Sequence, residues 1–449
     1  MVKTEYYKDL TKMNTFGMKV KARCFIEYDS VADLVDIEFE ELARPVLHIG
    51  GGSNLLFTDD FKGTVLHSKV NFIEILDEGQ CIPEAPSHSV GPSPEPAAAG
   101  FSLQRSTGPF AESLERVGKC LLHTNGTSSE DFDSTDTVTK NPSKSVIVSV
   151  GAGVVFDDFC AWAAKEGLWG VENLSYIPGE VGASAVQNIG AYGVEVKDVI
   201  RTVYCYDTVE EEFVSFDVSE CEYGYRDSIF KDPEVKGRYI VTHVVFELSS
   251  TPQPKLEYGH LREAVTAIVG ESRCVPETPA CQNAGAPYPE VGECLLHTNG
   301  TSPDNRNKPA SKLTPELIRK VIIKIRKEKL PEPSVMGSAG SFFKNPVVPA
   351  EHFQKIESAA KAEFGVDYKV PHYDLPDGMV KIPAAWMIEQ CGWKGRRSGG
   401  AAVYDKQPLV IVNYTGEAYP EEIIGLEKRI VASVKAKFDV ELHPEVDHI

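Results

Sequence analysis

A serine stands at the edge of a glycine-rich turn in the stretch GSAGSFFKNP, residues 337–346. The glycines and alanine before Ser341 let the backbone bend and approach a bound molecule closely. Phe342 and Phe343, which follow it, favour burial. A hydroxyl on the boundary between an open turn and an apolar pair marks Ser341 as a candidate for chemistry at a ligand.

Two charged residues stand in similarly suggestive surroundings. Arg226 lies among aromatic residues in YGYRDSIFK, residues 223–231, where a guanidinium either stacks structurally or binds an anion. Glu445 follows a proline in HPEV, residues 443–446, near the end of the chain. Taken singly, each has an ordinary structural explanation: packing for the arginine and solvent exposure for the glutamate.

The stretch GGGSN, residues 50–54, lies between two apolar runs. Successive glycines can turn several backbone N–H groups into one concavity that binds phosphate oxygens. A tight hairpin turn is the structural alternative. The stretch is not a dinucleotide-binding fingerprint, because no long helix follows it.

A second glycine-rich stretch, IPGEVGASAVQNIGAYG, spans residues 177–193. Its residues are too small to build a core, and such a chain can pass closely along a flat cofactor. Gln187 and Asn188 would then be placed to hydrogen-bond the edge of a ring. The alternative is an irregular surface loop.

Composition limits the class of protein. A chain of 449 residues is too long for one compact core, and its 42% hydrophobic and 25% charged residues are typical of a globular enzyme. The net charge of −20 argues against a nucleic-acid partner, although a few arginines can still bind a small anion. Ten cysteines without a C-x-x-C pair argue against a zinc site or a disulfide framework. With no apolar run of the ~18 residues that a membrane helix needs, and no signal peptide, we expect a reduced, cytoplasmic protein.

Several regular elements must position these residues. Apolar or alternating runs predict strands within residues 45–57, 145–156, 239–248 and 408–413, and the first ~80 residues suggest short strands with one helix. Asp157 is the expected N-cap of a helix that Gly167 ends, and Thr314 that of another. The predicted helices are residues 157–166, 314–331, 349–365 and 420–438.

Two stretches interrupt this pattern. Residues 80–142 and 270–312 are rich in Pro, Ser, Thr or Asn, as loops and disordered segments are. Both contain CLLHTNGTS, at residues 120–128 and 294–302. A duplicated surface insertion explains the repeat; a metal site built from its two Cys/His pairs is the alternative, which the spacing does not support.

Together and in order, these motifs closely resemble the UDP-N-acetylenolpyruvoylglucosamine reductase (MurB) family. The resemblance covers nearly everything outside the two insertions, and LEYGHL, residues 256–261, looks like the tyrosine-bearing loop of the family's type I branch. Besides the motifs already quoted, it rests on NTFG (14–17), the continuation GVEV (193–196) and PAAWMIEQCGWKGRRSGGAAVYDKQPLVIVN (383–413).

The resemblance implies an α+β protein with a two-lobed FAD-binding domain of the vanillyl-alcohol-oxidase (PCMH) type and a smaller α+β substrate-binding domain. The C-terminal helix and tail are expected to pack on the N-terminal lobe and bring Glu445 into the cleft. The expected parts are 15–250 (FAD-binding, with the insertion 80–142), 251–330 (substrate loop, insertion 270–312 and linking helix), 331–419 (substrate-binding) and 420–449 (helix and tail).

The resemblance also implies an oxidoreductase of peptidoglycan precursor synthesis, and hence of cell wall biogenesis, cell shape, cell cycle and cell division. NADPH gives a hydride to non-covalently bound FAD. UDP-N-acetylglucosamine enolpyruvate then takes the hydride at its vinyl CH2 carbon and becomes UDP-N-acetylmuramate. We expect a monomer without a metal, a nucleic-acid partner or a membrane partner.

Residue roles follow from the same resemblance. Ser341 matches the family's proton donor, Arg226 the arginine that stabilises the enol carboxylate, and Glu445 its acidic partner. The residues expected at the substrate are Tyr192, Tyr258, Lys329, Asn345 and Gln407. The residues expected at FAD are Gly50, Gly51, Gly52, Ser53, Asn54, Pro178, Gly179, Gly182, Ser184, Ile189 and Gly190.

Two other interpretations stay open at this point. A related FAD oxidase or dehydrogenase of another small substrate would keep the glycine stretches but would have no use for Arg226, Ser341 and Glu445 together. A catalytically disabled homologue would bind no flavin. The second insertion lies between Tyr258 and Lys329, in the segment that follows the substrate loop.

Overall fold

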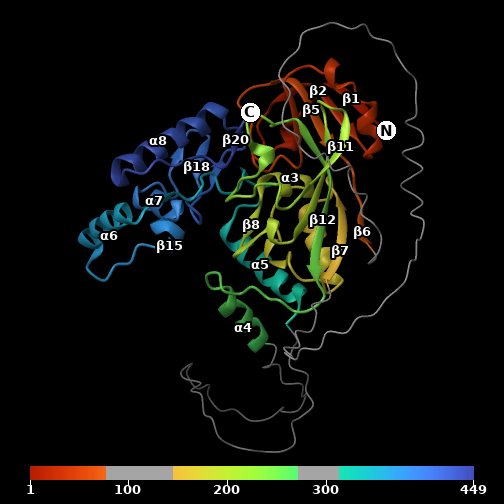
Figure 1. Ribbon diagram of the computed structural model, residues 1–449. Coiled ribbons are helices and arrows are strands. Elements are labelled where there is room, and N and C mark those ends of the chain that lie inside the picture. The colour runs from red at the N-terminus through yellow and green to blue at the C-terminus, as the bar shows by residue number, and fades with distance from the viewer. Residues whose placement is uncertain (77–144, 272–312) are drawn as a thin grey trace, which may run out of the picture.

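The computed structural model describes residues 1–76, 145–271 and 313–449 (Figure 1). Apart from residues 270 and 271, both predicted insertions lie outside the described residues, as do both copies of CLLHTNGTS. Within the described ranges, no helix combines the length and the apolar character needed to cross a membrane. The two larger sheets lie one above the other in Figure 1, and the C-terminal elements lie to one side of them.

The N-terminal sheet has the strand order β1-β2-β5-β3. β5 pairs in parallel with both β2 and β3, whereas β1 and β2 are antiparallel. The helix expected among the first ~80 residues is wrong for residues 1–76, because the helical segments there have three to five residues, too few to repay the nucleation of an α-helix. The strands are β1 (Lys3–Asp9), β2 (Lys21–Tyr28), β3 (Val46–Ile49) and β5 (Phe61–Ser68).

The second sheet is antiparallel throughout, with the order β11-β10-β12-β7-β6. Its core includes Phe159 of helix α2, whose ring centroid lies 4.7 Å from that of Phe246 in β12. The strands are β6 (Ile73–Leu76), β7 (Ser145–Gly151), β10 (Ile200–Asp207), β11 (Glu212–Asp217) and β12 (Tyr239–Ser249). Helices α2 (Phe156–Lys165) and α3 (Val181–Gln187) pack against it, α5 (Pro315–Lys329) packs against α2, and α4 (Leu261–Glu271) packs against α5.

The helix ends test the predicted caps. Thr314 caps α5, because its Oγ1 accepts a hydrogen bond from the Leu317 N–H at 3.2 Å. The predicted Asp157 cap is wrong, since α2 begins after Val155 without a side-chain cap. The Asp157 carboxylate instead pairs with Arg319 of α5, a stronger charged partner that the local sequence does not reveal.

The C-terminal elements form two small sheets covered by helices. The predicted helices 349–365 and 420–438 are confirmed as α6 (Ala350–Phe364) and α8 (Pro420–Phe438), and α7 spans Ala384–Gln390. Of the predicted strand 408–413, only Ile411–Asn413 pairs, as β19. The sheets are β13 (Gly337–Ser338), β19, β18 (Ala401–Val403) and β17 (Arg397–Ser398) in that order, and β14 (Val347–Pro349), β16 (Met379–Lys381) and β15 (Tyr373–Asp374).

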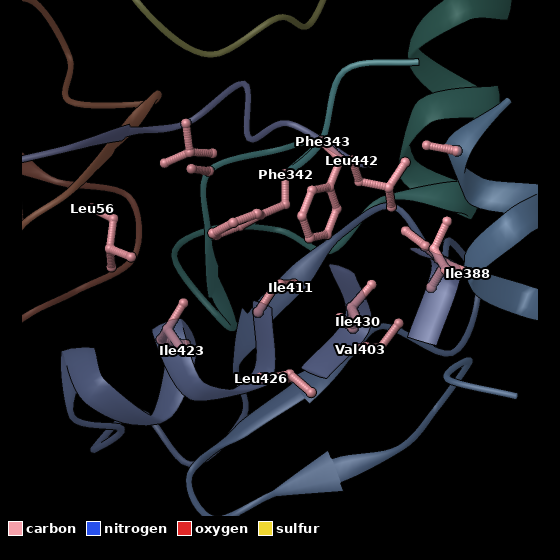
Figure 2. Close-up of a cluster of buried hydrophobic side chains, with 14 of the residues drawn as sticks. Leu56, Phe342, Phe343, Ile388, Val403, Ile411, Ile423, Leu426, Ile430 and Leu442 are labelled. Atoms are coloured by element: carbon pink, nitrogen blue, oxygen red, sulfur yellow. The ribbon is translucent and has the colours of Figure 1, made fainter. Parts of the chain in front are cut away.

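The C-terminal tail connects these elements to the N-terminal sheet. β20 (Asp447–His448) pairs in parallel with β4 (Leu55–Leu56), which directly follows the first glycine stretch. Figure 1 places the C-terminus beside the N-terminal strands. Figure 2 shows Phe342 and Phe343 in the apolar cluster that extends from Ile430 in α8 to Leu56 in β4.

Candidate active site

A cavity of about 1060 Å³ lies where the two glycine stretches, the linking helix α5 and the C-terminal tail meet. Arg226, Ser341 and Glu445 all line it, although they are far apart in the sequence. The eleven predicted cofactor residues line the same cavity, as do Tyr192, Tyr258, Lys329 and Gln407.

Asn345 is not among the residues that line this cavity. Its Oδ1 accepts a hydrogen bond from the Ala384 N–H at 2.9 Å, and its Nδ2 donates to the Tyr225 hydroxyl at 3.3 Å. Asn345 therefore ties the start of α7 to the aromatic residue beside Arg226.

The two glycine stretches lie against each other. A Cβ at Gly51 would lie 3.4 Å from Gly179 Cα, and Ser53 Oγ donates to the Pro178 carbonyl at 3.0 Å. Around them, the backbone N–H groups of residues 51–54 donate to no acceptor within the described ranges. Unpaired N–H groups on a cavity wall without bulky side chains can bind a diphosphate. Residues 50–54, the glycine cradle, therefore suit the FAD of the predicted domain.

Gly52 gives this cradle a testable weak point. Its φ is +60°, and a Cβ there would overlap the Met13 carbonyl oxygen. We expect Gly52→Ala to lower the free energy of unfolding by ~1–3 kcal/mol and to reduce the flavin content. Denaturant titration and flavin absorbance per chain measure the two effects.

Gly17→Ala is the matched control, because Gly17 has a similar φ of +68° with open space around the added carbon. Gly17→Ala should lower the free energy of unfolding by about 1 kcal/mol and leave the flavin content unchanged. Equal flavin loss in both variants would contradict a specific role of the Gly52 turn.

The second glycine stretch differs from its predicted form. Residues 181–187 form helix α3, which the sequence interpretation did not anticipate, and the helix lines the cavity. Asn188 ends this helix in the left-handed conformation, fully buried, and its Nδ2 donates to Glu195 and to the Gly224 carbonyl. Asn188 is therefore used internally and does not face a ring edge, whereas Gln187 does line the cavity.

Arg226 is held by the end of this same stretch. Its Nη1 donates to the Asn188 carbonyl at 3.2 Å and its Nη2 to the Gly190 carbonyl at 2.6 Å. Its Nε lies 2.9 Å from Glu445 Oε1 as an ion pair, but the arrangement is not that of a hydrogen bond. The guanidinium is thus fixed in position and retains one buried donor.

Glu445 is largely buried, with 16% of its side chain exposed. Burial raises the pKa of this carboxyl, against the opposing effect of Arg226, Lys231 and Lys344. A carboxyl with a raised pKa beside a fixed cation is typical of active sites.

Backbone pairing brings Ser341 to the same wall. The Glu445 N–H donates to the Phe342 carbonyl at 2.8 Å, and the Lys344 N–H to the His443 carbonyl at 2.9 Å. The Ser341 hydroxyl has no hydrogen-bond partner among the residues that the structure describes, and Phe342 and Phe343 are buried behind it. This small ladder, rather than any local motif, sets Ser341 beside Glu445.

Two tyrosines that line the cavity, Tyr192 and Tyr258, belong to a group of neighbouring aromatic side chains. Tyr258 is 46% exposed, and its ring lies 6.1 Å from that of Tyr192 and 6.4 Å from that of Tyr373. The Lys381 Nζ lies 4.7 Å from the ring centroid of Tyr225. These groups offer stacking faces and a cation to a nucleotide-sized ligand.

The sequence interpretation missed three cationic residues of the cavity, Lys231, Lys236 and Arg326. Lys231 donates to Gln187 at 2.9 Å, and burial lowers the pKa of its ammonium group. Arg326 of α5 also lines the cavity and donates to the Tyr176 carbonyl at 3.0 Å. Lys231 closes the quoted motif around Arg226 and could have been included, whereas no local signal distinguishes Arg326 from its basic neighbours in α5.

Comparison with known proteins agrees with this geometry. A family model described as "FAD binding domain" matches residues 131–211, which defines the chain as an FAD-binding flavoprotein. The model of the C-terminal domain of UDP-N-acetylenolpyruvoylglucosamine reductase matches residues 332–449.

Curated relatives extend the match to nearly the whole chain. The UDP-N-acetylenolpyruvoylglucosamine reductase of Bacteroides fragilis is 40% identical over 441 residues, which cover 98% of each chain. The reductase of Porphyromonas gingivalis is 35% identical over 443 residues, covering 98% of this chain and 97% of the relative. The chain therefore belongs to the UDP-N-acetylenolpyruvoylglucosamine reductase family, and the resemblance noted from the sequence is confirmed.

A solved structure supports the fold. The MurB of Thermus caldophilus matches with a TM-score of 0.51 and 18% identity, covering 100% of this chain and 98% of that one. The predicted α+β fold is confirmed, and the match to the FAD-binding family model shows that FAD is the cofactor.

Proposed function

We propose that this chain reduces UDP-N-acetylglucosamine enolpyruvate to UDP-N-acetylmuramate, with NADPH as the source of the hydride. The family membership supports the reaction. The observation that carries the proposal for this chain is the convergence of Arg226, Ser341 and Glu445 on one cavity that also contains the glycine cradle. That combination serves an enolpyruvyl ligand better than it serves a general flavin oxidase.

The cofactor residues have a binding role in this proposal. When bound, FAD supplies the hydride-transfer chemistry that links NADPH to the nucleotide. The N–H groups of residues 51–54 would bind the FAD diphosphate, and the neighbouring stretch 178–190 would cover the remainder of the cofactor. The attachment is non-covalent.

The three catalytic residues divide the work on the substrate, and Glu445 is the acidic partner of Arg226. Arg226 binds the carboxylate into which negative charge spreads after hydride transfer, and its fixed position avoids reorganisation during the reaction. Ser341 then gives its hydroxyl proton to the substrate carbon that carries this carboxylate, next to the carbon that received the hydride. Phe342 and Phe343 keep water from that position, so proton delivery is local.

The remaining predicted residues would hold the nucleotide. Tyr258 and Tyr192 offer stacking faces, and Lys329 and Gln407 line the same cavity. Asn345 would act at the edge of the site, where it contacts Tyr225. Because Asn345 does not line the cavity, it would act on the nucleotide through Tyr225.

We further propose that the protein is a cytoplasmic monomer whose parts follow the boundaries predicted from the sequence. Residues 15–250 would bind FAD, 251–330 would carry the substrate loop and linking helix, and 331–419 would bind the substrate. Residues 420–449 would close the structure through the tail that pairs with β4.

Stopped-flow absorbance tests the reaction directly. Mixing the holoenzyme with NADPH should bleach the flavin absorbance, and adding UDP-N-acetylglucosamine enolpyruvate without oxygen should restore it. Restoration by oxygen alone at the same rate, with no effect of the nucleotide, would favour a flavin oxidase instead.

The raised pKa of Glu445 predicts that the rate of flavin reoxidation by the nucleotide falls at low pH, which gives the pH–rate profile an acid limb. Protonation removes the charge that balances Arg226, so the rate should fall as the pH falls through a pKa that lies above the usual range of glutamate. Glu445→Gln should be slower by about 10²-fold and should lack this limb. The pH dependence of flavin reoxidation by the nucleotide measures both.

Glu445→Asp serves as the control, because it keeps a carboxylate, one methylene group nearer the backbone, and its rate should still fall at low pH. An unchanged limb in Glu445→Gln would assign the titration to another group.

A further inference from the structure

A buried histidine joins two carboxylates behind the glycine cradle. His67, near the end of β5, is 7% exposed. Its Nδ1 lies 3.1 Å from Glu27 Oε2 on β2, and its Nε2 lies 3.3 Å from Glu180 Oε1, at the residue that precedes α3. The imidazole therefore links the N-terminal sheet to the lobe that carries the second glycine stretch.

Glu180 lies directly against the cradle. A Cβ at Gly50 would lie 3.2 Å from Glu180 Oε2 and 3.2 Å from Ala183 Cβ, and Gly50 and Glu180 both line the cavity. An unbalanced carboxylate here would repel the diphosphate of FAD. The state of its partner, His67, thus matters for the cofactor.

The two contacts of His67 are satisfied together in only one protonation state. An imidazolium donates from both ring nitrogens, whereas a neutral imidazole donates from one and turns a lone pair toward the other carboxylate. Burial lowers the pKa of His67, but the contacts with Glu180 and Glu27 outweigh it, so the pKa is raised overall. Loss of the proton would weaken the link between the lobes and leave more negative charge beside the cradle.

Among the described residues, three other charged or titratable groups lie around His67: Lys69, His48 and Tyr28. The Lys69 ammonium lies 3.8 Å from Glu27 Oε2 and balances part of its charge. Burial lowers the pKa of His48 on β3 to about 4, so this histidine is neutral at physiological pH. The Tyr28 hydroxyl lies 3.0 Å from His48 Nε2. Burial raises the pKa of the Tyr28 hydroxyl. Of the two histidines, His67 is therefore the one whose contacts favour the charged form.

We propose that the His67 imidazolium is a positioning group for FAD: it joins the two flavin-binding lobes and neutralises Glu180 beside the cradle, so the protein binds FAD more tightly when His67 is protonated. The link is reciprocal, so bound FAD also favours the protonated histidine.

The proposal is tested by titrating the apoprotein with FAD and monitoring the quenching of the flavin fluorescence. The titrations cover about pH 6 to pH 8.5, the range in which a histidine of raised pKa titrates. The Kd of the wild-type protein should increase at least about fivefold over this range, as expected for two coupled sites. His67→Gln should bind FAD more weakly at the acidic end and should show no such increase. The readout is flavin affinity, so it is independent of the catalytic roles proposed above.

His48→Gln is the matched control, since His48 lies on the same sheet, lines the same cavity and is neutral throughout the range. It should keep the pH dependence of the Kd. Should His67→Gln fail to fold, Glu180→Gln replaces it, and its pH dependence should move to lower pH because one of the groups that raise the His67 pKa is gone. A wild-type Kd that is constant with pH, or the same slope in His67→Gln or Glu180→Gln as in the wild type, would overturn the proposal.

Discussion

Ser341→Ala is expected to accept a hydride from NADPH at the wild-type rate and to stall in the second half-reaction. The variant keeps the cradle and the Arg226–Glu445 pair, so flavin binding and reduction are unaffected. Loss of a positioned proton donor typically slows proton transfer by about 10²–10⁴-fold. Stopped-flow reoxidation of the flavin by UDP-N-acetylglucosamine enolpyruvate measures this step separately from reduction by NADPH.

The reason for so large an effect is the isolation of the hydroxyl. Phe342 and Phe343, which follow Ser341, are buried in the apolar cluster and offer no polar group that could replace the lost donor. Ser341→Cys, which keeps a proton of lower pKa at nearly the same position, should recover part of the rate.

Ser338→Ala provides the matched control, because Ser338 ends β13 three residues before Ser341 and also lines the cavity. It should turn over at close to the wild-type rate. An equal slowing of both half-reactions in Ser341→Ala would remove Ser341 from the role of proton donor.

The sequence predicts the regular elements well where local signals are complete. Helix α5 has an N-cap at Thr314, a proline in its first turn and an apolar stripe, and it forms as expected. Asp157 fails as a cap although its local pattern is equally good, because Arg319 is distant in the sequence and competes for the same carboxylate. Local rules therefore hold until a charged tertiary partner is available.

The candidate site depends on contacts that no local pattern encodes. Ser341 and Glu445 are brought together by hydrogen bonds between residues 342–344 and 443–445, and the family resemblance, not spacing, pointed to their convergence. Asn188 appeared free for a ligand because its neighbours are small, yet its left-handed backbone and two side-chain hydrogen bonds use it internally. His67 gives no signal, since a lone histidine in a strand is usually a core residue.

Arg226→Lys is expected to be the second severe variant, with the rate of flavin reoxidation by the nucleotide lowered by about 10²–10³-fold. The guanidinium holds the carbonyls of Asn188 and Gly190 with two nitrogens while a third lies beside Glu445. A lysine keeps the charge but offers one ammonium group, which cannot satisfy these positions and a substrate carboxylate together. The same stopped-flow measurement applies.

Two comparisons separate binding of the substrate carboxylate from support of the flavin loop. Arg238→Lys alters another arginine–carboxylate pair, with Asp207, outside the cavity, and should leave reoxidation unchanged. If Arg226 serves the substrate, flavin content and reduction by NADPH stay normal in Arg226→Lys while reoxidation falls. If its main work is to hold residues 188–190, flavin content and both half-reactions fall together, and the catalytic assignment of Arg226 is wrong.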